Sequence, residues 1–367
     1  SQRGLVTRDQ LYAQALEEMK KDNLPTTETN RQEYIEALID THVAQNLSPG
    51  DIENYINLAR KRDNAQTLSM LVNRDQASSE EIVKALREFC DIPKGEVYIS
   101  REEAEGIRVA LISRFISNQL PCISLAKNYI TIRDADGILQ NTLFSRRRPG
   151  KLGGKAAGMI LAHKILLPTL EQKDPELEDL IRIPDTWHLN SGVFSEFLDR
   201  NNLYLFHTFK YKDRESIEKD FLRIEEQFKF ATFSPEVVED FRKILGEIGE
   251  HPIIVRSSSM LEDNFGLAFS GKYMSVFLTN QGNLETRLSN FVVALKKVFA
   301  STFGPDPILY RRDHGLLDYD ERMAMVVQKV VGRRFGDYFF PFAAGVMFSR
   351  NVYAWNPKIQ KEAGLVR

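Results

Sequence analysis

The chain has 367 residues, of which 43% are hydrophobic and 27% are charged. This composition is typical of globular proteins and excludes a disordered chain, and the length allows two or three domains. The formal net charge of -2 supplies no basic field, so we expect neither a nucleic-acid partner nor an anionic membrane surface.

Residues 1–148 predict a helical domain whose role the sequence leaves open. Ser48-Pro49-Gly50-Asp51 and Ser78-Ser79-Glu80-Glu81 are helix start signals. A further helical pattern from Glu102 to Leu120 is expected to break at Pro121 and to resume through Ile130. Apolar residues recur at helical spacing in three earlier stretches, namely Leu11, Ala15, Leu16 and Met19, then Tyr34, Ile35, Leu38 and Ile39, then Ile56, Leu58, Ala59, Leu68 and Leu71.

A basic run, Arg146-Arg147-Arg148-Pro149, ends this region. We interpret it as a solvated linker. Its position directly before a glycine-rich loop keeps a second interpretation open, in which it attracts phosphate.

The glycine-rich loop runs from Gly150 to Gly158 and enters an apolar helical segment, Met159 to Leu167. Lys155 is therefore expected at a helix N-terminus, where free N–H groups and the helix dipole favour anions. Ala156 follows the lysine, so this is not the nucleotide-binding Walker A pattern. The loop predicts either a phosphate site or a tight turn before a core helix.

A second candidate segment runs from His251 to Gly271. The β-branched residues Ile253 to Val255 predict a short buried strand, at whose end Arg256 emerges. A fixed guanidinium can pair with phosphate oxygens in bidentate fashion, and the serines at 257–259 add further donors. The alternative is an arginine in a structural ion pair.

Helical and strand patterns are mixed from residue 149 onward, which predicts an α+β domain over 149–367. The expected helices are Glu215–Phe230, Pro235–Ile248 and Asn283–Phe299, and the expected strands are Ile253–Val255, Tyr273–Leu278, Met323–Val331 and Ala344–Phe348.

The remaining features argue for a cytoplasmic protein. The longest apolar run, Tyr338 to Phe348, contains Pro341 and is shorter than the roughly 20 residues of a membrane-spanning helix. Cys90 and Cys122 have no metal-site spacing, and Ser1 begins no secretory leader. We expect two unpaired thiols in a reducing compartment.

Five ordered blocks resemble one known family: GKLGGKAAGM, IPDTWHLNSGVFSEFL, IIVRSSSMLEDNFGLAFSGKYMSVF, MAMVVQKVVG and YFFPFAAGVMFSRNVYAWNP. They resemble the N-terminal nucleotide-binding domain of phosphoenolpyruvate synthases and pyruvate phosphate dikinases. The resemblance covers Gly150 to Arg367. It implies the first lobe of an ATP-grasp-like fold that passes a phosphoryl group from ATP to a histidine on another domain, from which a further domain passes it to pyruvate.

The resemblance also implies roles for individual residues. Lys155 and Arg256 would be the catalytic contacts to the ATP phosphates. Lys272 replaces the family's usual glutamine, which leaves its role open. Glu262 and Asp263 would order the loop rather than bind metal. The expected ATP-binding residues are Gly153, Gly154, Lys155, Arg256, Ser270, Gly271 and Ser275, with Gln328, Lys329 and Val330 at the hinge that meets adenine.

The resemblance further implies that the second lobe is incomplete here, that the magnesium ligands lie outside this chain, and that the chain is an inactive N-terminal fragment of an ATP-dependent phosphotransferase. The acceptor could be pyruvate or another small molecule, such as an antibiotic or a glucan. Two alternatives remain open: a non-catalytic module that binds a nucleotide or a partner, and a purely structural role. None of the scattered histidines is expected to be catalytic; they are His42, His163, His188, His207, His251 and His314.

Overall fold

A computed structural model describes residues 8–21, 28–92, 99–262, 269, 271–351, 356 and 358–367. The chain forms two compact units, the first of Ser1–Asp75 and Glu81–Ile107 and the second of Gln76–Glu80 and Arg108–Arg367.

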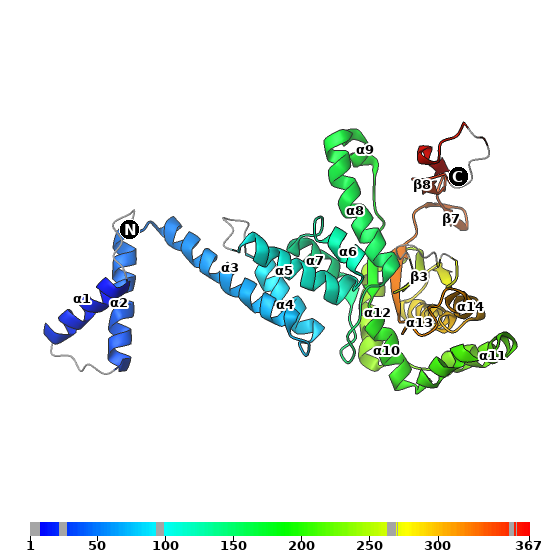
Figure 1. Cartoon of the computed structure of the whole chain (residues 1–367), viewed down its shortest axis with the longest axis horizontal. Helices are drawn as coiled ribbons and strands as arrows, with labels where there is room; N and C mark the ends of the chain where they lie inside the picture. Colours follow the sequence, from blue (N-terminus) through cyan, green and yellow to red (C-terminus); the bar gives the residue numbers. More distant parts are fainter. Residues whose placement is uncertain are drawn as a thin grey trace. The chain divides into compact units, whose positions relative to one another are not determined.

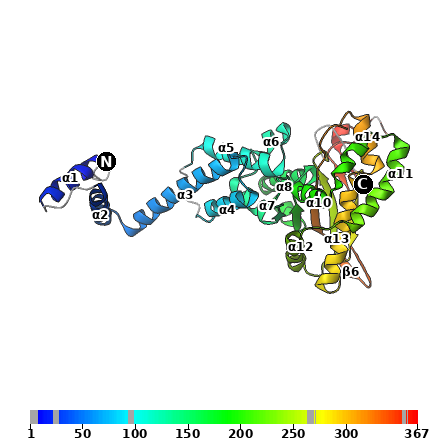
Figure 2. The same ribbon diagram turned by 90° about the horizontal axis from the view of Figure 1, so that it is seen from below.

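The first unit is helical in its described residues, as the sequence predicts. Ser48 caps α3 by accepting a hydrogen bond from the backbone N–H of Asp51, and Pro49 lies in the first turn. Asn64 of α3 donates to the carbonyl of Glu88 in α4 at 2.9 Å, and Figures 1 and 2 show these two helices side by side. The helices are α1 (Arg8–Lys21), α2 (Glu28–Asn46), α3 (Pro49–Asn73), α4 (Ser79–Cys90) and α5 (Arg101–Leu111).

The next helices differ from the expected break at Pro121. After α5 the chain forms one π-helical turn, η1 (Ile112–Ile116), and then leaves the helix at Ser117. Pro121 lies in the first turn of α6 (Leu120–Ala126), where a proline loses no helical hydrogen bond. Pro121 therefore begins a helix instead of ending one, and that helix stops before Ile130. A separate helix, α7 (Ile132–Gln140), follows.

A five-stranded mixed sheet forms the centre of the second unit. Its strands lie in the order β1 (Thr142–Leu143), β2 (Thr186–Leu189), β5 (Met323–Lys329), β3 (Ile253–Ser259) and β4 (Ser275–Leu278). β1 pairs with β2 in parallel, and every other pair is antiparallel. The mixed sheet and its helices confirm an α+β fold. Neither β1 nor β2 was predicted, and β1 comes from the region expected to be helical.

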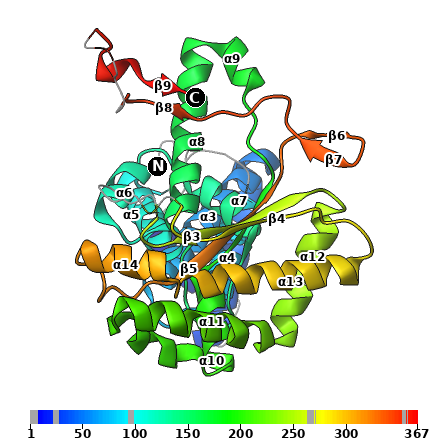
Figure 3. The ribbon, with the colours of Figure 1, turned by 90° about the vertical axis from the view of Figure 1, so that its right-hand side faces the viewer.

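Helices cover both faces of the sheet (Figure 3). α8 packs against β3 and β5 on one face, while α10 and α13 pack against the strands on the other. The three helices predicted in this unit are confirmed as α11, α12 and α13. The helices are α8 (Gly154–Lys173), α9 (Pro175–Leu180), α10 (Ser191–Arg200), η2 (Leu203–Tyr211), α11 (Arg214–Phe230), α12 (Pro235–Ile248), α13 (Leu284–Ser301) and α14 (Pro305–Asp313).

The main core lies on the α10 and α13 side of the sheet. Ile253 and Val255 are completely buried there, and Phe194, Phe241 and Phe299 belong to the same cluster. Successive residues of a strand point to opposite faces. Ile254 and Arg256 therefore face the α8 side, and the packed core fixes their direction.

The chain beyond β5 forms two small strand pairs, where the sequence predicts one strand, Ala344–Phe348. β6 (Arg333–Phe335) pairs with β7 (Tyr338–Phe340), and β8 (Met347–Phe348) pairs with β9 (Leu365–Val366). The short helix η3 (Lys361–Ala363) precedes β9. The strand expected over 344–348 is limited to its last two residues. Neither pair joins the five-stranded sheet (Figure 3), although the ring of Phe339 in β7 lies 5.3 Å from that of His251, just before β3.

Candidate functional site

The glycine loop packs directly against the end of β3. Gly153 caps α8 with φ +82, a backbone conformation that favours glycine. A Cβ atom at Gly153 would lie 1.7 Å from the carbonyl oxygen of Ser258, and one at Gly154 would lie 1.6 Å from that of Glu262. Both glycines therefore allow a backbone approach that no other residue permits.

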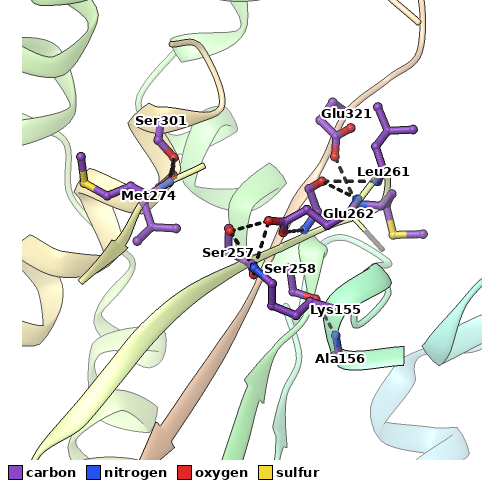
Figure 4. A network of polar contacts seen from close by, with 12 residues as sticks. Lys155, Ala156, Ser257, Ser258, Leu261, Glu262, Met274, Ser301 and Glu321 are labelled. Atoms are coloured by element: carbon purple, nitrogen blue, oxygen red, sulfur yellow. Dashed lines mark hydrogen bonds and ion pairs between the residues drawn. The ribbon is translucent and has the colours of Figure 1, made fainter. Parts of the chain in front are cut away.

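Lys155 lies in the first turn of α8, as predicted, and points to the strand end (Figure 4). Its Nζ atom lies 3.0 Å from the carbonyl oxygen of Ser257 and 3.0 Å from Oε1 of Glu262. A third contact, to Oγ of Ser257, is longer at 3.4 Å. The ammonium group is thus held by one carboxylate and one backbone carbonyl, with its third hydrogen weakly engaged.

Glu262 connects the lysine to the three serines at the end of β3, residues 257–259, which we call the serine segment. Its side chain is 3% exposed. Oε1 accepts a hydrogen bond from Oγ of Ser257 at 2.9 Å, and Oε2 accepts one from the backbone N–H of Ser259 at 2.9 Å. These bonds support the expected role of Glu262 in ordering the loop (Figure 4). Asp263, the other member of the acidic pair, lies outside the described residues.

Ser258 joins the strand to the glycine loop from the α8 side of the sheet. Its Oγ atom accepts a hydrogen bond from the backbone N–H of Ala156 at 3.0 Å and donates to the carbonyl of Leu152 at 2.8 Å. It therefore satisfies one of the free N–H groups at the start of α8. The sequence predicts these serines only as donors to a ligand, and this role in joining the loop to the strand is not visible in it.

Arg256 is half-buried on the same face as Ser258, two residues along β3. Among the described residues its guanidinium makes no hydrogen bond and no ion pair. The structural interpretation of Arg256, in which it forms an ion pair, therefore has no partner in the part of the chain that the structure describes. Ser257, whose carbonyl holds Lys155, is its direct neighbour.

A buried carboxyl group behind the serine segment was not predicted from the sequence. Glu321 is 3% exposed, and its Oε1 atom accepts a hydrogen bond from the backbone N–H of Met260 at 3.1 Å. Burial raises the pKa of Glu321 to about 7. The neighbouring sequence, Asp320-Glu321-Arg322, is charged throughout. A run of this kind is typical of an exposed segment, so the sequence does not indicate that Glu321 is buried.

The residues expected to form the hinge are hydrogen-bonded to neighbouring segments of the same chain. The backbone N–H of Lys329 donates to the carbonyl of Asp185 at 3.0 Å, and that of Val330 donates to the carbonyl of Pro252 at 2.9 Å. The Gln328 side chain donates to Oγ1 of Thr186 at 2.9 Å. The next residue, Val331, is 62% exposed, and within the described residues its backbone groups make no hydrogen bond.

The segment expected to cover the phosphates is described in part. Gly271 has φ +74, and Ser275 is an exposed residue of β4 that pairs with Arg256. The Nζ atom of Lys272 lies 5.3 Å above the ring centre of Tyr310. Ser270 lies outside the described residues.

The described ranges contain no group of three or more His, Cys, Asp or Glu side chains placed to hold a metal ion. They also contain no helix with the length and apolar character to cross a membrane. Of the histidines, His188 of β2 is buried, and burial lowers its pKa to about 4.

The basic run before the glycine loop is fixed on the second unit by ion pairs. Arg146 lies 2.7 Å from Asp240, and Arg148 lies 2.6 Å from Asp199. The expectation of a solvated linker is therefore wrong in part: these side chains are exposed, but both hold a carboxylate partner.

Sequence comparison finds relatives with named activities. The phosphoenolpyruvate synthase of Aquifex aeolicus is 27% identical over 180 residues, which cover 46% of this chain and 20% of the relative. The rifampicin phosphotransferase of Bacillus cereus is 24% identical over 185 residues, which cover 49% of this chain and 20% of the relative. A probable phosphoenolpyruvate synthase of Archaeoglobus fulgidus is 27% identical over 211 residues, covering 54% and 26%.

The chain thus spans about a fifth to a quarter of the length of these relatives. Residues 150–364 match the family described as the pyruvate phosphate dikinase AMP/ATP-binding domain. This match covers more than half of the chain and includes the glycine loop, the serine segment and the hinge. Through these residues, the chain belongs to the pyruvate phosphate dikinase AMP/ATP-binding domain family.

Proposed function

We propose that the second unit binds ATP with its triphosphate on the α8 side of the sheet, where Lys155 and Arg256 form one anion site. The observation that carries the proposal is the Arg256 guanidinium, which emerges from a buried strand without a partner among the described residues. The carbonyl of its neighbour, Ser257, lies 3.0 Å from the Lys155 ammonium. A fixed guanidinium beside a positioned ammonium suits phosphate oxygens.

The two cations would act by charge neutralisation. Phosphoryl transfer depends mostly on positioning and on stabilising charge on the phosphate oxygens. Lys155 already has fixed partners in Glu262 and Ser257, so its direction needs little reorganisation when phosphate binds. Phosphate oxygens would take the weakly engaged third hydrogen of its ammonium.

The other family residues keep the roles that the resemblance implies. The N–H groups of Gly154 and Lys155 at the start of α8 would face the phosphates, since that of Ala156 is bound by Ser258. Val331 follows the predicted hinge, and its backbone N–H and carbonyl, which bond to no described residue, would extend the candidate adenine edge by one residue. The proposed ATP-binding set comprises Gly153, Gly154, Ser270, Gly271, Ser275, Gln328, Lys329 and Val330, together with Lys155 and Arg256.

We further propose a role in an ATP-dependent phosphotransferase that resembles phosphoenolpyruvate synthase. The phosphoryl group would pass to a histidine on another domain and then to pyruvate or another small acceptor. Magnesium, held by ligands outside this chain, would supply positive charge that neutralises the triphosphate. We also propose an ATP-grasp-like arrangement of lobes and a cytoplasmic location. The chain alone is then expected neither to hydrolyse ATP nor to transfer phosphate.

A second candidate function is a non-catalytic module that binds a nucleotide or a partner. The observation that favours it is the occupied glycine loop: the carbonyls of Ser258 and Glu262 fill the space beside Gly153 and Gly154. Glu262 also holds Lys155. A site of this kind would bind ligands without using Arg256.

An NMR titration of the chain with ATP, into the millimolar range, tests the proposal. Arg256→Ala should weaken binding by about tenfold, as expected for the loss of a charge-assisted phosphate contact. Arg214→Ala, which removes a surface arginine of α11 that is 73% exposed, should change nothing. Wild-type binding that Arg256→Ala leaves unchanged would contradict the proposal and favour the non-catalytic module.

A further inference from the structure

One short segment ahead of the family domain supports both candidate phosphate loops. It runs from Ser113 to Gln119, through the π-helical turn η1 and the residues after it. None of it lies within the matched residues 150–364. Family membership therefore assigns it no role.

The glycine loop is held by the carbonyls at the end of η1. The Lys151 ammonium donates to the carbonyl of Ser113 and, at 3.3 Å, to that of Arg114. The backbone N–H of Leu152 donates to the carbonyl of Phe115 at 2.9 Å. The last carbonyls of a helix lack partners within the helix and carry partial negative charge, so a lysine there is stabilising.

The backbone of Lys151 is held by Ser191, at the start of α10. Its backbone N–H donates to Oγ of Ser191 at 3.0 Å, and its carbonyl accepts from the N–H of Ser191 at 2.9 Å. No carboxylate of the described residues forms an ion pair with its ammonium. The half-buried side chain therefore joins η1 to the loop and, among the described residues, neutralises no acidic group.

The serine segment is held by the same stretch. Nε2 of Gln119 donates to the carbonyl of Met260 at 3.0 Å. Met260 directly follows the three serines, and its own N–H is bound by buried Glu321. Residues 113–119 thus contact one loop through η1 and the other through Gln119.

We propose that Lys151 and Gln119 are positioning residues that hold the glycine loop and the serine segment at the separation that the triphosphate requires. The inference rests on the proposed function. Lys155 lies three residues after Leu152, which η1 holds, and Arg256 lies four residues before Met260, which Gln119 holds. A shift of either loop would move one cation relative to the other.

The test compares Lys151→Met and Gln119→Ala with a matched control, Lys296→Met. Lys296 also donates to a carbonyl near a helix end, that of Lys229 in α11 at 2.9 Å. It lies on α13, across the sheet from the phosphate loops. NMR titrations of the whole chain use three probes: ATP, inorganic tripolyphosphate and adenosine.

Lys151→Met should weaken binding of ATP and of tripolyphosphate by about fivefold or more, and Gln119→Ala by about two- to fivefold, since each variant loses hydrogen bonds that hold one loop in place. Adenosine binding should stay unchanged in both variants. Lys296→Met should alter none of the three affinities. Amide exchange in residues 152–156 and 257–262 should become faster in Gln119→Ala.

An equal loss for adenosine and tripolyphosphate would mean that the two residues only stabilise the fold. Unchanged tripolyphosphate binding in Gln119→Ala would also overturn the inference, and this variant decides the matter if Lys151→Met does not fold. A wild-type chain that binds neither ATP nor tripolyphosphate would refute the proposed function, and the inference would fall with it. If the wild type and both variants bind tripolyphosphate equally well, the inference is refuted and the proposed function still stands.

Discussion

The two ends of the β3–β5 strand pair differ in burial and in hydrogen bonding. At the Ser259 end, buried polar groups are bound to one another: Glu262 holds Lys155, and Glu321 holds the N–H of Met260. At the Lys329 end, the chain runs out into small strand pairs whose apolar side chains are exposed. Tyr338 is 73%, Phe342 91% and Met347 80% exposed.

The difference indicates which part of the site exists before a ligand arrives. The Ser259 end, where we propose that the phosphates bind, is organised by its own hydrogen bonds, so substitutions there should reduce the free energy of unfolding. The segment beyond the hinge contributes little burial, so substitutions there should alter association and leave stability unchanged.

The largest effect is expected at the glycine loop. Gly154→Ala places a Cβ atom 1.6 Å from the carbonyl of Glu262, so backbone must shift. We expect the free energy of unfolding in urea to fall by at least about 3 kcal/mol. Gly246→Ala in α12, where nothing lies within 4 Å of the new atom, should instead stabilise by roughly 0.5 kcal/mol. Similar unfolding curves for the two variants would show that the loop is not packed as described.

The next effect is expected from the buried ion pair. Glu262→Ala leaves the ammonium of Lys155, whose side chain is 16% exposed, without its carboxylate. It also removes the acceptor of the Ser259 N–H. Breaking such a pair costs about 3 kcal/mol. Glu239→Ala is the control, because its pair with Arg242 is exposed and should contribute less than about 1 kcal/mol. Equal losses in the two variants would contradict the buried network.

The pH dependence of stability tests the other buried carboxyl group. The pKa of Glu321 is about 7 in the folded chain against an ordinary 4.5. Between these values the folded state keeps a proton that the unfolded state releases, so stability falls as pH rises from about 4.5 to 7. The loss should total roughly 2–3 kcal/mol. Glu321→Gln should remove this part of the pH dependence in urea unfolding measured from pH 4.5 to 8. An unchanged pH profile in the variant would mean that Glu321 titrates normally.

The smallest change in stability is expected beyond the hinge. Phe342→Ser and Met347→Ser replace exposed apolar side chains and should change the free energy of unfolding by less than about 0.5 kcal/mol. Exposed apolar patches favour association, so both variants should reduce self-association in sedimentation velocity runs at increasing concentration. A wild-type chain that stays monomeric throughout would break the contrast between the two ends.

Local signals in the sequence predicted much of the fold. Ser48 and Asn283 act as caps at the starts of α3 and α13, and apolar periodicity located α11 to α13. β2 was missed because Trp187 and His188 do not show the alternation of a half-buried strand. β1 was missed because two residues carry no pattern, and only its partner β2, more than 40 residues later, makes it a strand.

The candidate site was predictable in its residue types and less so in its contacts. The glycine loop and the strand before Arg256 are visible as patterns. The pair of Lys155 and Glu262 joins residues that are 107 positions apart, and no local pattern encodes it. The support from Lys151 and Gln119 depends likewise on how η1 packs, which only the folded chain defines.

The most direct test of the central claim is a crystal structure of the chain with a non-hydrolysable ATP analogue. The account predicts the triphosphate on the α8 side of the sheet, with Nζ of Lys155 and the Arg256 guanidinium both within hydrogen-bond distance, roughly 3 Å, of phosphate oxygens. A triphosphate bound elsewhere, or one contacted by only one of these two cations while the other points to the opposite side of the sheet, would contradict it.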